Sequence, residues 1–182
     1  GRQALSFYGN YRATDRDIGL PGELPFGRYR YSQLVGGIRW AYSPHPDWEF
    51  ALFAERGREA LDLKVGDVDQ LGEYQAALGS VAVQLRHDSI DSSSFPSRGQ
   101  RLSITYQNFL EALGAEGTAG VTRVQWDRAW SYGENRLMGG VRVSTAHGGD
   151  DLLAAYGFLG GLANLSGYPE AAIFAPQTAL AR

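Results

Sequence analysis

The segment ALGSVAVQLRHD, Ala77–Asp88, alternates between two kinds of side chain along its length. Small and aliphatic residues occupy one set of alternate positions: Ala77, Gly79, Val81, Val83 and Leu85. Mostly polar residues occupy most of the other set: Ser80, Ala82, Gln84, Arg86 and Asp88. Because successive side chains of a β-strand point to opposite faces of a sheet, this alternation predicts a strand with one apolar and one polar face.

The same period recurs along the chain, whereas stretches with a helical period are scarce and short. The matching segments are 5–11, 34–42, 48–55, 102–106, 122–130 and 138–145. With the residues around them, most of these segments have about the length, roughly 9–11 residues, that a strand needs to cross a membrane at a tilt. Gly36-Gly37 and Gly139-Gly140 lie inside two of the segments, and we interpret these paired glycines as bulges.

We therefore expect an all-β protein, an antiparallel transmembrane β-barrel, in which residues 1–182 form a single domain with about eight to nine strands. The apolar face, with aromatic residues near strand ends, would contact lipid. The face with Arg, Glu, Gln and Asp beside small residues would line a watery lumen. A soluble β-barrel or sandwich remains an alternative, because alternation alone does not say which face is outside.

Composition excludes several classes of protein. The 182 residues contain no cysteine, which excludes disulfides, thiolate metal sites and a cysteine nucleophile. The net charge of -3 gives no reason to expect nucleic-acid binding. No apolar run is long enough for a membrane-spanning helix.

Signals for catalysis are absent from the sequence. It has no Gly-x-Ser-x-Gly motif, and its three histidines are isolated. His147 with Asp150 and Asp151 is best explained as a solvated loop rather than a metal site. We expect no catalytic, cofactor or metal site in this chain. We interpret Thr14–Gly27, with its acidic residues, as an extracellular loop, and 43–47 as a short periplasmic turn.

A longer segment, RHDSIDSSSFPSRGQRLS, joins two of the expected strands, from Arg86 to Ser103. Pro96 removes a backbone donor and Gly99 permits a positive φ, so the segment has the chemistry of a sharp hairpin end. Its motif residues are Arg86, Asp88, Phe95, Pro96 and Gly99. The pattern resembles the bacterial surface-antigen family of outer-membrane barrels, which includes barrel-assembly proteins, two-partner secretion transporters and the barrels of patatin-like autotransporters.

A second segment, LGGLANLSGYP at 159–169, looks like the long loop that folds back into the barrel in this family. Its motif residues are Gly160, Gly161, Asn164, Leu165, Ser166, Gly167 and Tyr168. This sequence motif most resembles the one in the barrels of patatin-like autotransporters. We expect residues 150–176 to form this loop in the lumen, with a short helix within 150–159. Many members carry Arg where Ser166 stands, so packing of Tyr168 and backbone bonds would hold the loop here.

The resemblance implies a barrel of about 16 strands, of which this chain would supply the middle to later ones. It implies an outer-membrane protein of a Gram-negative bacterium that anchors and translocates a passenger domain, a patatin-like lipase encoded upstream. The rival functions are an assembly or two-partner secretion barrel, a soluble ligand-binding module, and a lipolytic enzyme of which this chain is the anchor. The implied partners are outer-membrane lipid, the passenger, the barrel-assembly machinery and a second copy, with no cofactor. Lumen-lining residues would be Arg86, Arg123, Asp127 and Arg142.

The chain starts at Gly1 without Met, and we interpret it as part of a longer protein. An open sheet leaves unpaired N–H and C=O groups at two edges, which lipid does not tolerate. We therefore expect that the chain does not stand as a lone open sheet. Either the strands close as a small barrel, or two copies pair, or further residues complete the wall. We favour the last.

Overall fold

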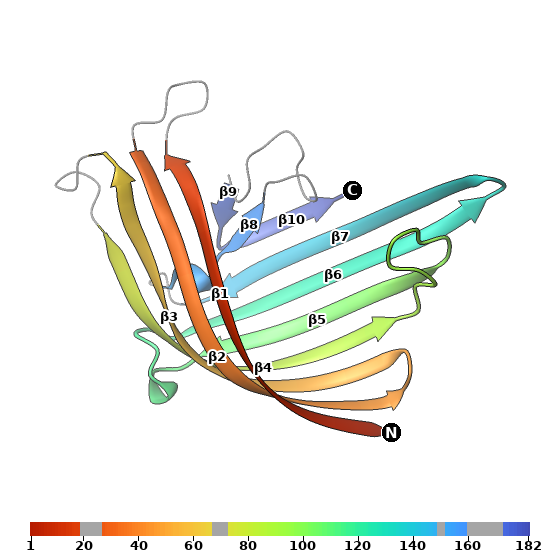
Figure 1. Cartoon of the computed structure of the whole chain (residues 1–182), viewed down its shortest axis with the longest axis horizontal. Coiled ribbons are helices and arrows are strands. Elements are labelled where there is room, and N and C mark those ends of the chain that lie inside the picture. Colours follow the sequence, from red (N-terminus) through yellow and green to blue (C-terminus); the bar gives the residue numbers. More distant parts are fainter. Residues whose placement is uncertain (19–26, 67–72, 149–151, 160–172) are drawn as a thin grey trace.

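The computed structural model describes residues 1–18, 27–66, 73–148, 152–159 and 173–182. These residues form an all-β structure, as expected, dominated by one antiparallel sheet of eight strands in the order β1-β2-β3-β4-β5-β6-β7-β10 (Figure 1). Its strands are β1 (Arg2–Ile18), β2 (Gly27–His45), β3 (Trp48–Val65), β4 (Tyr74–Asp88), β5 (Gly99–Phe109), β6 (Ala119–Tyr132), β7 (Asn135–His147) and β10 (Gln177–Ala181). Within the described residues, no helix is long and apolar enough to cross a membrane.

Four smaller elements accompany the sheet among the described residues. The 3₁₀ turn η1 (Glu111–Leu113) follows β5, and the 3₁₀ turn η2 (Leu153–Ala155) follows β7. The strands β8 (Gly157–Leu159) and β9 (Ile173–Ala175) form a separate two-stranded sheet. Within 152–159, the described part of 150–159, the expected short helix is a single 3₁₀ turn.

The first strands are longer than the alternation suggested. Strands β1, β2 and β3 have 17, 19 and 18 residues. The expectation of a loop over Thr14–Gly27 is wrong for Thr14–Ile18, which continues the ladder opposite Gly27–Tyr31. Asp15 is therefore a strand residue, and it accepts a hydrogen bond from Arg30 across the pair at 2.7 Å. Asp15 and Arg30 are direct partners in the antiparallel ladder. The turn-forming residues nearby in the sequence made this part of the strand look like a loop.

The sheet curves strongly, so that it has a concave and a convex face (Figure 1). One hollow of about 590 Å³ is lined by Tyr8 of β1 and also by Thr178 of β10, the two edge strands. Side chains from the two opposite edge strands can line the same hollow only on the concave face of the sheet. The residues that share a face with Tyr8, among them Glu55 and Arg123, therefore line the concave face.

The sheet is open. Among the described residues β1 pairs only with β2, and β10 only with β7. The expectation that the chain would not stand as a lone open sheet is therefore wrong for the chain by itself, and the strands do not close into a small barrel. The interior of an eight-stranded barrel is filled by wall side chains. Here a further part of the chain, Leu152–Leu159, contacts the wall from the concave side. Completion of the wall by other residues stays a prediction.

The paired glycines do not mark bulges. The ladder runs without interruption through Gly37 and through Gly140, and the irregularities of β2 lie near Arg28 and Tyr42 instead. A Cβ on Gly37 would lie 2.9 Å from the ring of Tyr8, and a Cβ on Gly140 would lie 2.3 Å from a carboxylate oxygen of Asp127. Both glycines make room for a side chain of the neighbouring strand that lies over them.

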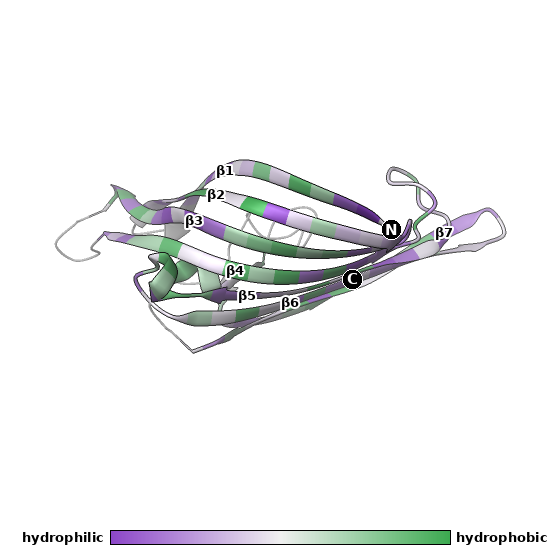
Figure 2. Cartoon of the chain, turned by 90° about the horizontal axis from the view of Figure 1, so that it is seen from below, coloured by the Kyte–Doolittle hydropathy of each residue, from purple (hydrophilic) through white to green (hydrophobic). Residues whose placement is uncertain are grey.

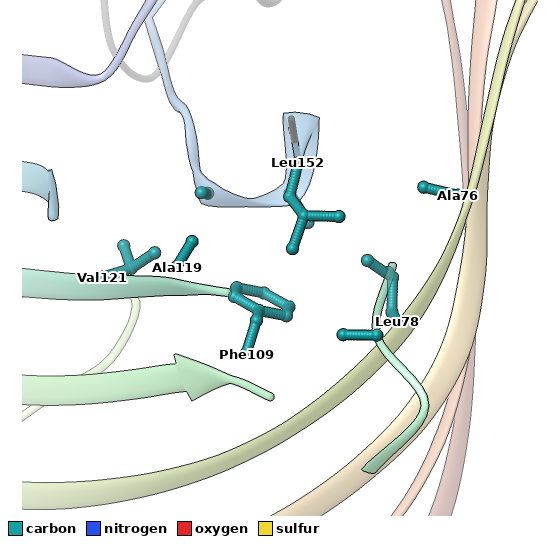
Figure 3. Packing of buried hydrophobic residues seen from close by; sticks show 9 residues of the cluster. Ala76, Leu78, Phe109, Ala119, Val121 and Leu152 are labelled. Atoms are coloured by element: carbon teal, nitrogen blue, oxygen red, sulfur yellow. The ribbon is translucent and has the colours of Figure 1, made fainter. Parts of the chain in front are cut away.

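A small apolar core joins the wall to the segment after β7 (Figure 3). The wall contributes Leu78, Phe109 and Val121, and the segment contributes Leu152, which is fully buried. Burying a leucine contributes roughly 1.5–3 kcal/mol. The core therefore holds the start of the segment against the concave face, which positions the polar groups described next.

Candidate functional site

The convex face carries a continuous apolar band that is exposed. Phe7 is 74% exposed, Ile38 45% and Val83 43%. No Asp, Glu, Lys or Arg occupies the convex positions of the band. On the first four strands these positions run over 5–11, 34–42, 48–54 and 79–87, and on the next three over 102–108, 120–126 and 139–145. Monomeric soluble proteins rarely expose apolar patches of this extent.

Aromatic and charged residues frame the band. Trp40, Trp48, Trp126 and Trp130 all lie on convex positions, and the expected aromatic residues near strand ends are among them. Trp130 lies near the β6–β7 turn, with the guanidinium of Arg128 5.5 Å from its ring centroid. In Figure 2 hydrophobic residues recur along the middle of β3 and β4, and hydrophilic residues lie toward their ends. Tryptophan favours the boundary between an apolar and an aqueous layer, so this distribution fits a membrane interface.

On the concave face a hydrogen-bonded network crosses the sheet. Glu55 accepts hydrogen bonds from the hydroxyl of Tyr8 at 2.5 Å, the hydroxyl of Ser80 at 3.2 Å and the amide of Gln107 at 2.9 Å. Arg123 donates to the carbonyl oxygen of the Gln107 side chain at 2.9 Å. The network thus links β1, β3, β4, β5 and β6. All of its members line the hollow on the concave face, opposite the apolar band.

Two wall residues hold the backbone of η2. Glu59, only 1% exposed, accepts hydrogen bonds from the hydroxyls of Tyr31 and Tyr74, each at 3.0 Å. The backbone N–H groups of Leu153 and Ala154 also donate to this carboxylate. Arg123 donates to the carbonyl oxygen of Ala154 at 3.1 Å. The Glu59 carboxylate therefore binds the N–H groups of this turn, and the Arg123 guanidinium binds one of its carbonyl oxygens. Hydrogen bonds to charged groups are stronger than those between neutral groups.

Nearer the β6–β7 turn, a second polar group surrounds Asp127, which is 2% exposed. Asp127 accepts hydrogen bonds from Gln125 at 2.6 Å and from Arg182, beyond the end of β10, at 2.9 Å. The ion pair ties the last strand to β6 across β7. A buried carboxylate needs such partners, because its desolvation would otherwise be costly.

The hairpin motif forms a hydrogen-bonded turn between β4 and β5. Asp88 accepts hydrogen bonds from Arg86 at 3.0 Å and Arg101 at 2.9 Å, and Gly99 has a φ of 100°. Any Cβ on Gly99 would lie 2.1 Å from the carbonyl oxygen of Ser89, so only glycine fits there. Phe95 is 75% exposed, so the motif's aromatic residue does not anchor it.

Asp91 caps the same turn. It accepts hydrogen bonds from the backbone N–H of Ser97 at 2.9 Å and of Arg98 at 3.2 Å, and from the Ser97 hydroxyl. These donors, the Ser97 hydroxyl first, lower the pKa of Asp91 to about 2. The turn is also tied to β6, because the hydroxyl of Ser131 donates to the carbonyl oxygen of Ser97 at 2.7 Å.

The sequence-predicted residues have different outcomes. Arg123, Asp127 and Arg142 all lie on the concave face, where Arg123 and Arg142 line the hollow. Gly160, Gly161, Asn164, Leu165, Ser166, Gly167 and Tyr168 lie outside the described residues. Glu55 ends the expected segment 48–55 and lies on the concave face. Glu59 was not predicted, although it follows at the period-two position beyond Gly57 and could have been found by extending the strand.

The concave face presents a wall of hydrogen-bonded polar side chains. Among the described residues, no group of three or more His, Cys, Asp or Glu residues could hold a metal ion. Comparison of the chain with protein-family models finds no match, and neither does comparison with curated proteins.

Proposed function

We propose that this chain forms part of the wall of a β-barrel in the outer membrane of a Gram-negative bacterium, and that the barrel anchors and translocates a passenger domain. The observation that carries the proposal is the uncharged apolar band on the convex face, opposite a polar concave face. A soluble barrel buries its apolar positions inside, which is the reverse of this distribution. A transmembrane barrel has an apolar outside and a polar inside.

The dimensions of the band support the membrane assignment. On β2 it runs from Leu34 to Tyr42. At about 3.3 Å per residue this distance is about 26 Å along the strand. A strand tilt of about 40° reduces it to about 20 Å along the membrane normal, and the side chains at both ends add to this height. The result is close to the apolar band of about 25 Å in known outer-membrane barrels.

The translocator role rests on the two motif resemblances and on the polar concave side. A polypeptide that crosses a membrane needs a hydrated path, and the concave face supplies polar groups on every strand from β1 to β7. The resemblance to patatin-like autotransporters makes a lipase the proposed passenger, carried by residues outside this chain. The same wall would also suit an assembly or two-partner secretion barrel, which inserts or exports other proteins.

Fractionation of cells that express the protein at its full native length tests the proposal. We expect the protein in detergent-extracted outer membranes, with heat-dependent migration on gels. We also expect the passenger to be accessible to protease added outside intact cells. Recovery as a soluble monomer without detergent would contradict the membrane assignment. An outer-membrane protein that leaves no passenger at the surface but exports or inserts a separate protein would favour the rival barrel.

A further inference from the structure

A second hollow, of about 500 Å³, lies where the β4–β5 hairpin meets the end of β6. Its lining includes Arg98 of the hairpin, Gln100 of β5, and Arg128 and Trp130 of β6. Among the described residues, no aspartate or glutamate lines it. Two arginines from different parts of the chain therefore border one small space.

Both arginines of the second hollow are exposed, and their guanidinium groups are available to a ligand. The ion pairs within the described part of the chain are made by other arginines, namely Arg30, Arg39, Arg86, Arg101 and Arg182. The guanidinium of Arg128 lies 5.5 Å from the centroid of the Trp130 ring. This contact uses the face of the guanidinium, so its N–H donors stay free to bind an anion.

The carboxylates of the hairpin have partners of their own. Asp88 is held by two other arginines, and Asp91 by three donors of its own turn. One of these donors is the backbone N–H of Arg98, so the backbone of this arginine is fixed while its side chain is exposed. The hydroxyl of Ser131 donates to the carbonyl oxygen of Ser97 at 2.7 Å, which holds the hairpin against β6. The two arginines are thus carried by one hydrogen-bonded unit.

The second hollow adjoins the end of the apolar band. Gln100 and Arg128 are partners in the β5–β6 ladder, on convex positions next to the uncharged ones. The indole N–H of Trp126, inside the band, donates to the side chain of Gln100 at 3.3 Å. With the band in lipid, the second hollow lies at the level of the headgroups, where Trp130 also fits. A lipid whose acyl chains contact the band would place its headgroup at the two arginines.

From these observations we infer that the second hollow binds the phosphate of an anionic phospholipid in the adjacent membrane leaflet. Guanidinium groups bind phosphate oxygens through paired hydrogen bonds and keep their charge at any physiological pH. Two arginines also favour a headgroup with a net negative charge over a zwitterionic one, because they repel its ammonium group. The inference rests on the proposed membrane barrel, since lipid reaches the second hollow only if the band lies in a membrane.

The test is lipid binding by the full-length protein, purified in neutral detergent and measured by native mass spectrometry. We expect phosphatidylglycerol to bind more tightly than phosphatidylcholine, which carries the same phosphate beside a cationic ammonium group. Arg128→Gln should lower the affinity for phosphatidylglycerol about fivefold, and Arg98→Gln should lower it further in the double variant. The matched control, Arg136→Gln, removes an exposed arginine of the neighbouring β6–β7 hairpin that does not line the second hollow, and should leave the affinity unchanged.

Glycerol phosphate, which has no acyl chains, distinguishes a lipid site from a site for free phosphate. We expect it not to displace phosphatidylglycerol, and displacement at equal concentration would overturn the lipid assignment. Equal affinity for the two lipids, or equal losses in Arg128→Gln and Arg136→Gln, would overturn the inference and leave the barrel. Recovery of the protein as a soluble monomer would overturn the barrel itself. Heat-dependent gel migration of each variant verifies that it is folded.

Discussion

Replacing Val124 by arginine tests directly which face of the sheet meets lipid. Val124 lies on the convex face of β6, between Ile104 of β5 and Val143 of β7. Its neighbour Gln125 lies on the concave face and donates a hydrogen bond to Asp127. The same substitution at these two adjacent positions therefore introduces the same side chain on opposite faces of one strand.

The position of Val124 in the band sets the expected cost. The nearest charged convex residue on β6 is Arg128, four positions away, which is about 13 Å along the strand. At a tilt of about 40° this places Val124 about 10 Å below the edge of an apolar band about 25 Å tall, near its middle. Arginine at that depth costs about 2–4 kcal/mol. At position 125 an arginine faces water beside Asp127, and the cost should stay below about 1 kcal/mol.

The assay is reversible unfolding of the full-length protein by guanidinium chloride in lipid vesicles, followed by tryptophan fluorescence and by heat-dependent gel migration. A difference of 3 kcal/mol between the two variants corresponds to about a hundredfold change in the folding equilibrium constant. Val124→Leu serves as an apolar control and should be nearly neutral. Equal costs for Val124→Arg and Gln125→Arg would refute the assignment of the convex face to lipid.

Three further predictions concern packing, the inner turn and pH. Gly37→Ala should destabilise the protein by about 1–3 kcal/mol in the same assay, because its Cβ would overlap the ring of Tyr8; a stability equal to wild type would show that the ring does not need this space. Glu59→Gln should release η2 and increase its cleavage by added protease in limited proteolysis, whereas Glu49→Gln, also on the concave face, should not; equal cleavage in both variants would contradict the proposed anchor. The pKa of Asp91 is lowered to about 2 in the folded turn, so its contribution to stability should be present above about pH 4 and lost as the pH falls toward 2. Hydrogen exchange of the turn amides checks this, and Asp91→Asn should remove the pH dependence in that range.

Much of the fold is predictable from local alternation. The period of two in Ala77–Asp88 corresponds to β4, and the same reasoning found the other long strands and their apolar faces. It also placed Trp126 and Arg123 on opposite faces, since side-chain direction along a strand depends only on sequence position. Local pattern is sufficient for these features because each of them belongs to a single strand.

Features that depend on two or more distant segments were not predictable in this way. The glycine at position 37 looked like a bulge because the side chain that occupies its space, Tyr8, comes from another strand. Likewise, Thr14–Ile18 is a strand only because β2 supplies its pairing partners. The contact of Glu59 with η2 joins residues far apart in the chain, which no local pattern encodes.

The most direct test of the membrane assignment measures the environment of alternating residues on β4. The chain has no cysteine, so single cysteines can carry spin labels. Labels at Val81, Val83 and Leu85 should collide with oxygen, which concentrates in lipid, and labels at Gln84 and Arg86 with a water-soluble nickel complex. In the membrane-inserted full-length protein, we expect this accessibility to alternate with a period of two. Equal accessibility of all five positions to the nickel complex would contradict it.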